Sequence, residues 1–206
     1  MPHNKRDTYV AKGGGMGNKG LKTKEVIRQQ AYRLFAEKGF SAISMKDLCD
    51  ACGLSRGGLY RHYGSTQQVF EDILEETLKA DEGMVQESMK EGISAGEILE
   101  GLLERMRQEM LDEKHSLSYA LYEYSVKCDN RFMTEQNRRA KQRWQKLIEY
   151  GIQRGEFAPV NVEQITDMIL YAYQGVRMWS RMVRLEEKTA QNIVDKIRTD
   201  LEGKGL

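Results

Sequence analysis

Proline is scarce in this sequence, and the alternating pattern of β-strands is missing. The chain has two prolines, Pro2 and Pro159, so long stretches contain no residue that would break a helix. No segment sustains the alternation of polar and apolar side chains that is typical of a strand. The scarcity of proline and the absence of strand-like alternation together predict an all-α fold.

Cysteine is also scarce, which excludes a disulfide framework. The three cysteines are too few and odd in number for one. Cys49 and Cys52 form a C-x-x-C pair, which could indicate redox chemistry or half of a zinc site. The third cysteine and the three histidines supply no second pair at zinc-binding spacing. We therefore expect these cysteines to be structural, with no metal and no cofactor.

Long apolar runs are missing as well. No run approaches the roughly 18 residues of a membrane helix, and the N-terminal residues lack the apolar segment of a secretory signal. We expect a cytoplasmic protein with no membrane partner. The sequence also lacks a paired acid and base or an activated nucleophile, so an enzyme is not expected.

The net charge of +1 hides an asymmetry between the two parts of the chain. Residues 1–64 hold 12 Lys and Arg against 5 Asp and Glu, whereas the rest holds 20 against 26. A basic N-terminal part on an acidic body indicates that the N-terminal part meets a polyanion.

Glycine and charge patterns divide the chain into three parts. Residues 1–22, rich in Gly, Lys and Arg, have the composition of a flexible basic arm, and no apolar strand precedes them as a phosphate-binding loop would require. Residues 23–66 contain three short helices, and residues 67–206 form a helical body. The expected helices cover residues 23–38, 45–52, 56–63, 66–91, 95–113, 115–127, 131–154, 161–184 and 187–202.

The spacing around Gly53 predicts a helix-turn-helix. Ser44 would cap the first helix of this motif and Ser55 the second, while apolar residues on both helices pack them together. Gly57 and Gly58 then occupy the first turn of the second helix, where each costs about 1 kcal/mol relative to alanine. Glycines there would let the helix backbone press against a DNA duplex.

The residues around these glycines suit contacts with DNA. Arg56 could reach a guanine edge, while Tyr60, Arg61 and Tyr63 could bind phosphates. His62 would pack or bind a phosphate. Taken singly, the tyrosines could instead pack on the first helix, and Arg61 could be a solvated charge.

The stretch FAEKGFSAISMKDLCDACGLSRGGLYRHYGSTQQVFEDIL resembles the signature of the tetracycline-repressor (TetR/AcrR) family of bacterial transcription regulators. In that family the matching positions that touch DNA are Ser44, Ser55, Arg56, Gly58, Tyr60, Tyr63 and Thr66. Family members usually carry lysine where this chain has Thr66, so one cationic phosphate contact is missing. The resemblance implies a homodimeric repressor on double-stranded DNA, released from a palindromic operator by a small molecule.

The helical body carries two features that bear on that function. Residues 161–184 are apolar on two faces, which predicts burial on two sides, and residues 187–202 have one apolar stripe. The predicted dimer interface comprises Ile165, Gly175, Ile193, Ile197 and Leu201. The predicted ligand pocket comprises Met106, Met110, Tyr119, Tyr122, Trp144, Tyr171, Gln174 and Met178, with Glu123 suited to a cationic ligand if it faces inward. The alternative is a DNA-binding regulator with no effector, controlled by protein partners or by its abundance.

Overall fold

A computed structural model describes residues 18–112 and 114–203, and within these ranges the only regular structure is helical. The all-α prediction is therefore confirmed. The helices are α1 (Asn18–Lys38), α2 (Met45–Cys52), α3 (Arg56–Tyr60), α4 (Thr66–Lys90), α5 (Ala95–Leu111), α6 (Ser118–Lys127), α7 (Arg131–Gln153), α8 (Val162–Trp179) and α9 (Glu187–Glu202). None of the described helices combines the length and the apolar character needed to cross a bilayer.

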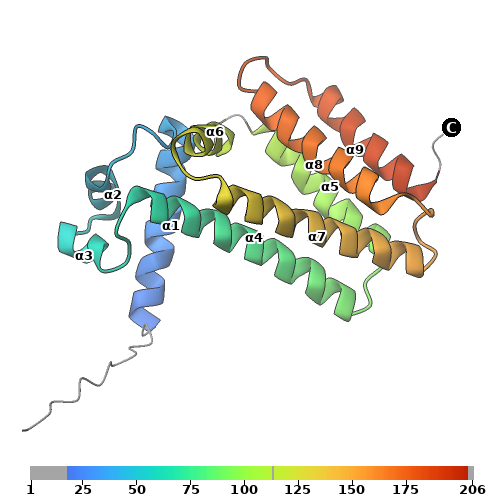
Figure 1. Ribbon diagram of the computed structural model, residues 1–206, viewed down its shortest axis with the longest axis horizontal. Coiled ribbons are helices and arrows are strands. Elements are labelled where there is room, and N and C mark those ends of the chain that lie inside the picture. The colour runs from blue at the N-terminus through green and yellow to red at the C-terminus, as the bar shows by residue number, and fades with distance from the viewer. Residues whose placement is uncertain (1–17, 113, 204–206) are drawn as a thin grey trace, which may run out of the picture.

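Two groups of helices are joined by the long helix α4. Figure 1 shows α1, α2 and α3 at one end, with α4 leading away from them alongside α7 toward α5, α8 and α9. Helix α6 packs on α1, although it lies far along the chain. Its Tyr124 is fully buried among Phe35, Phe40 and Phe70, with its ring centroid 5.3 Å from those of Phe40 and Phe70. The N-terminal helices are thus fixed to the body through both α4 and α6.

Local signals place both ends of α2 and the start of α3 where the sequence predicts them. Ser44 forms a capping box with Asp47, because its side chain accepts a hydrogen bond from the Asp47 backbone while the Asp47 carboxylate accepts one from the Ser44 backbone. Gly53 ends α2 with a φ of 62°, a left-handed conformation that favours glycine. The Ser55 side chain then caps α3.

Four predicted helix ends differ from the structure by three residues or more. Helix α3 ends at Tyr60, earlier than expected. Helix α1 begins at Asn18, so residues 18–22 are helical rather than part of an arm, and the rest of the predicted arm lies outside the described residues. Helix α6 begins at Ser118, later than expected. Helix α8 ends at Trp179, and residues 180–183 form turns instead of continuing the helix.

The apolar stripe of α9 belongs to the core of the protomer. Ile197 and Leu201 are fully buried, and α9 packs on α5 of the same chain. Ile165 of α8 is buried in the same core, and Ile193 is half-buried against it. Ile165, Ile197 and Leu201 are therefore not exposed for a dimer seam as predicted, because their own protomer already covers them, whereas Ile193 is covered only in part. Gly175, by contrast, is exposed.

Candidate DNA-binding surface and internal cavity

The helix-turn-helix is held together by apolar contacts beneath an exposed polar face. Leu48 of α2 and Leu59 of α3 are fully buried in one core with Ile27 and Phe35 of α1. Because α3 spans only five residues, its orientation depends on this packing and on its cap rather than on helix propensity.

The N-terminal end of α3 faces solvent. The Ser55 Oγ accepts a hydrogen bond from the Gly58 backbone N–H at 3.1 Å. Arg56, Gly57 and Tyr60 are exposed, and the Arg56 guanidinium lies over the Tyr60 ring, 5.4 Å from its centroid. The stacking holds the guanidinium beside the helix end, where a recognition helix meets base edges.

The two glycines of α3 have different surroundings. A Cβ added at Gly57 would meet nothing within 4 Å, whereas one at Gly58 would lie 3.3 Å from the Ser55 Oγ. A side chain at position 58 would therefore crowd the Ser55 cap of α3. Nothing inside the described protomer requires glycine at position 57.

The other predicted DNA contacts differ in exposure. Ser44, Ser55 and Arg61 are exposed, while Gly58, His62 and Thr66 are half-buried. Thr66 is the first residue of α4, which the Ser65 side chain caps by accepting a hydrogen bond from Gln68.

Tyr63 is the predicted contact that turns inward. Its side chain is 3% exposed, and its hydroxyl donates a 2.5 Å hydrogen bond to Asp72 Oδ2 of α4. Burial, with this bond to a carboxylate, raises the pKa of Tyr63. The hydroxyl that was expected to bind a phosphate instead ties the end of α3 to α4.

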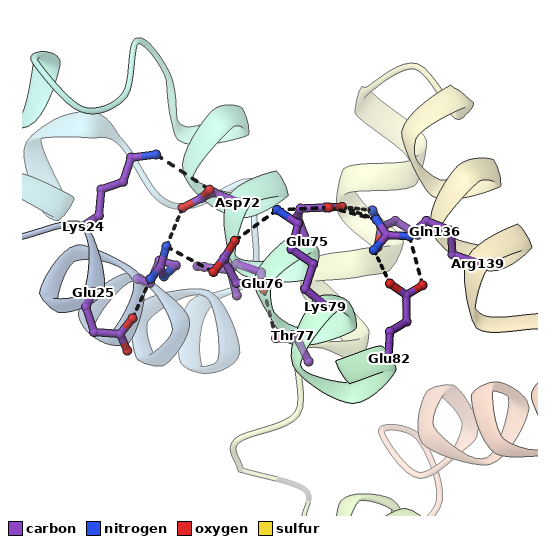
Figure 2. A network of polar contacts seen from close by, with 12 residues as sticks. Lys24, Glu25, Asp72, Glu75, Glu76, Thr77, Lys79, Glu82, Gln136 and Arg139 are labelled. Atoms are coloured by element: carbon purple, nitrogen blue, oxygen red, sulfur yellow. Dashed lines mark hydrogen bonds and ion pairs between the residues drawn. The ribbon is translucent and has the colours of Figure 1, made fainter. Parts of the chain in front are cut away.

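Ion pairs connect helix α4 to α1 and to α7, as Figure 2 shows. On one side, Asp72 lies 3.2 Å from Arg28 Nη1 and 3.9 Å from Lys24 Nζ, both on α1. On the other side, Arg139 of α7 binds Glu75 at 2.7 Å and Glu82 at 2.6 Å. The Arg139 side chain is mostly buried, and its hydrogen bond lowers the pKa of Glu75. Sequence reasoning missed this network, because only the fold brings α7 beside α4.

A cavity of about 490 Å³ lies among α4, α5, α6, α7 and α8. Its volume falls in the usual range for small-molecule sites. Of the predicted pocket residues, five line it: Met106, Tyr122, Trp144, Gln174 and Met178. Helix α4 contributes Leu74, Thr77, Leu78 and Asp81 to the wall.

The other predicted pocket residues lie elsewhere. Met110 is fully buried in the apolar core and does not line the cavity. Tyr119 and Tyr171 are exposed on the outside of the protomer. Glu123 does not face the cavity either, because its carboxylate accepts a hydrogen bond from the Ser41 backbone N–H at 2.9 Å.

One part of the cavity wall is charged. Asp81 of α4 lies 2.8 Å from both Arg105 of α5 and Arg143 of α7. Nearby, Arg177 Nη1 donates to the Tyr173 hydroxyl at 3.0 Å, and that hydroxyl donates to the Glu109 carboxylate. None of these charged residues was predicted, because the sequence shows a helix face but not which faces meet.

Two family models match most of the length of the chain. Residues 27–73 match the model of bacterial regulatory proteins of the tetR family, and residues 98–192 match the tetracyclin repressor-like C-terminal domain. The first match covers the helix-turn-helix described above, and the second covers most of the body that holds the cavity.

Relatives and solved structures agree with these matches. The chain is 31% identical over 153 residues to the HTH-type transcriptional repressor KstR2 of Rhodococcus jostii, covering 71% of this chain and 73% of that protein. It is 29% identical over 140 residues to the HTH-type transcriptional regulator YfiR of Bacillus subtilis, covering 65% and 67%. A TetR transcription regulator from Haloarcula marismortui has the same fold, with a TM-score of 0.70 at 20% identity over 88% of this chain and 98% of that one.

An exposed recognition helix on a helical body defines a DNA-binding transcriptional regulator rather than an enzyme. The chain belongs to the TetR family.

Proposed function

We propose that the protein is a homodimeric repressor that a small molecule releases from a palindromic operator. The main support is that α4 takes part in both sites. Its first half contacts α1 and Tyr63, and its Leu74, Leu78 and Asp81 line the cavity. A molecule that fills the cavity therefore touches the helix that positions the DNA-binding unit.

The repressor would act through the distance between two recognition helices. In a dimer these helices must lie about 34 to 36 Å apart to enter successive major grooves. A ligand that binds one arrangement of α4 better than the other would shift the population toward it. If that arrangement moves one recognition helix by a few ångströms, the dimer can bind only one of the two half-sites of the operator.

An exposed apolar stripe on α8 supports the dimer. Tyr171 is 71% exposed and Trp179 is 60% exposed, and Met182 follows in the turn after the helix. Gly175 lies between Tyr171 and Trp179 and would allow a second helix to approach closely. A monomer rarely leaves such large apolar side chains together in water, so this stripe suits the two-fold interface.

The proposal is tested by selecting duplexes from a random library with the purified full-length chain. We expect the selected sequences to contain an inverted repeat whose half-sites are about one helical turn apart. If the dimer neutralises roughly 6 to 10 phosphates, its affinity for that site should fall about 10³- to 10⁵-fold between 50 and 200 mM salt. Selection of unrelated single half-sites would contradict the dimeric readout.

The effector is sought by mass spectrometry of small molecules that co-purify with the protein. Adding the identified molecule should release the selected duplex in a fluorescence-anisotropy titration. A protein that carries no small molecule, and whose operator affinity does not respond to a cell extract, would favour control by protein partners or abundance.

A further inference from the structure

The cavity holds a buried cation that the protein itself does not fully compensate. The Arg177 side chain is only 13% exposed. The Glu109 carboxylate lies 3.9 Å from its Nη1, beyond hydrogen-bond range. Its other contacts are with neutral groups: the Tyr173 hydroxyl at 3.0 Å, the Ser116 Oγ at 3.5 Å and the Tyr173 ring, whose centroid lies 5.0 Å from the guanidinium. Burial lowers the pKa of Arg177, which indicates that the charged form is poorly solvated there.

The charges that line the cavity leave an excess of one cation. Arg105, Arg143 and Arg177 face two carboxylates, Asp81 and Glu109. Asp81 is shared between Arg105 and Arg143, and Glu109 accepts a hydrogen bond from Tyr173. The Nε atoms of Arg143 and Arg177 are buried, and no described residue accepts a hydrogen bond from either. Buried arginines normally have such acceptors.

The rest of the wall is mainly apolar and adaptable. It includes side chains from five helices, namely Leu74, Leu78, Met106, Leu121, Met133, Trp144, Ile169 and Leu170. An apolar chain would bury its surface there, and methionine side chains can repack around chains of different shape. The cavity therefore offers a cationic end and an apolar body.

We propose that the cavity binds an amphiphilic carboxylate, with the carboxylate at Arg177 and the apolar part between α4, α5 and α7. The inference rests on the proposed function only in taking this cavity as the effector site. A planar guanidinium can bind a carboxylate through two parallel hydrogen bonds, which would supply the acceptor that the Arg177 Nε lacks. The apolar part would then contact Leu74 and Leu78 of α4.

A cationic amphiphile fits the same cavity less well. Glu109 is the carboxylate that could receive it, but Tyr173 already donates to Glu109, and both Arg105 and Arg177 lie within 4 Å of it. Burial also raises the pKa of Glu109, which indicates that its charged form is poorly solvated there. A cation would therefore add to an existing excess of positive charge.

The test is isothermal titration calorimetry of the full-length protein with decanoate, decanol and decylamine. These probes share one apolar chain and differ in the charge of the head group. We expect decanoate to bind at least tenfold more tightly than the other two. Equal binding of decanol would show that only the apolar chain is recognised, and tighter binding of decylamine would reverse the assignment of charge; either result overturns the proposal.

Two variants assign the head group to Arg177. Arg177→Met should weaken decanoate binding about 10- to 100-fold, as expected for the loss of charge-assisted hydrogen bonds, and should leave decanol binding unchanged. Arg131→Met removes the same charge from an exposed position on α7 and should change neither. Unchanged decanoate binding by a folded Arg177→Met protein would overturn the proposal.

Glu109→Gln keeps the test informative if Arg177→Met fails to fold. Glu109 lies 3.9 Å from Arg177 Nη1, so removing its charge removes a like charge beside the proposed carboxylate site. Decanoate binding should then tighten about fivefold even in a water-like dielectric. Weaker binding would contradict the proposal. Operator titrations separate this inference from the proposed function: decanoate that binds at Arg177 without releasing DNA would refute ligand control while leaving the carboxylate site intact.

Discussion

At the scale of single residues, the two glycines of α3 have different roles: Gly58 matters for folding, and Gly57 is expected to matter for contact with DNA. Gly58 has an internal reason to be glycine, because a Cβ there would crowd the Ser55 cap. Gly57 has none within the protomer, although it costs helix propensity. The cost at Gly57 is explained if its backbone lies against DNA.

Gly57→Ala is therefore expected to stabilise the protein and to weaken operator binding. Alanine should raise the free energy of unfolding by up to about 1 kcal/mol, because it favours the helix and meets open space. The same methyl group should lower operator affinity at least tenfold if the backbone touches the duplex. Gly83→Ala in α4 is the matched control, because its surroundings are equally open, and it should stabilise the fold without changing DNA binding. Urea unfolding and anisotropy titrations measure the two effects.

If Gly57→Ala stabilises the protein and still binds the operator normally, the glycine has no role at the DNA surface. The approach of α3 to the duplex would then have to be different from the one we propose.

Arg56 and Tyr63 are expected to affect DNA binding in different ways. Arg56→Ala should relax discrimination at one base position by about 1 to 3 kcal/mol, because the exposed guanidinium is placed to read a base edge. Tyr63→Phe removes the bond to Asp72 and should cost about 1 kcal/mol of stability. Any loss of its DNA affinity should be equal on cognate and scrambled duplexes. Equal losses on both duplexes for Arg56→Ala would remove the specific role of Arg56.

At the scale of elements, the sequence predicts what is local and misses what is long-range. Ser44, Gly53 and Ser55 act within a few residues of themselves, so their capping and turn roles could be read directly. The Arg139 contacts join positions more than 50 residues apart, and no periodicity reveals them. Periodicity also predicted that the Ile197 face of α9 is buried, but it could not distinguish its own α5 from a second subunit.

The contacts of Arg139 with α4 should make a measurable contribution to stability. Arg139→Met should lower the free energy of unfolding by about 1 to 3 kcal/mol near neutral pH, because it leaves two carboxylates of α4 without their shared partner. Arg138→Met is the control, since Arg138 is exposed and pairs with Glu135 on its own helix, and it should cost less than 1 kcal/mol.

The Arg139 effect should depend on pH in a defined direction. The folded protein lowers the pKa of Glu75 from its ordinary value of 4.5, so this contribution to stability is present above pH 4.5 and is lost as the pH falls below it. The difference between wild type and Arg139→Met should shrink over that range, as followed by urea unfolding at each pH. A difference that stays constant with pH would show that Arg139 acts through packing rather than through Glu75.

At the scale of the whole molecule, the position of the apolar stripes decides where two copies can meet. The apolar stripe of α9 is used inside the protomer, whereas Tyr171, Gly175 and Trp179 remain exposed on α8. A two-fold axis through α8 would cover these residues with their own symmetry mates. Palindromic DNA has the same symmetry, so assembly and operator recognition would be linked.

Tyr171→Glu should therefore disrupt the dimer, whereas Ile197→Glu should disrupt the fold. Tyr171→Glu places charge on the exposed stripe, so we expect a folded monomer by analytical ultracentrifugation, with an unchanged far-ultraviolet circular dichroism spectrum. Its operator affinity should fall far more than the loss of one contact would explain, because both half-sites are no longer held together. Ile197→Glu buries an unpaired carboxylate in the core and should unfold the body instead. If the Tyr171→Glu protein stays dimeric and keeps full operator affinity, the interface must lie on another face. If the Ile197→Glu protein is folded and monomeric, the interface must include α9.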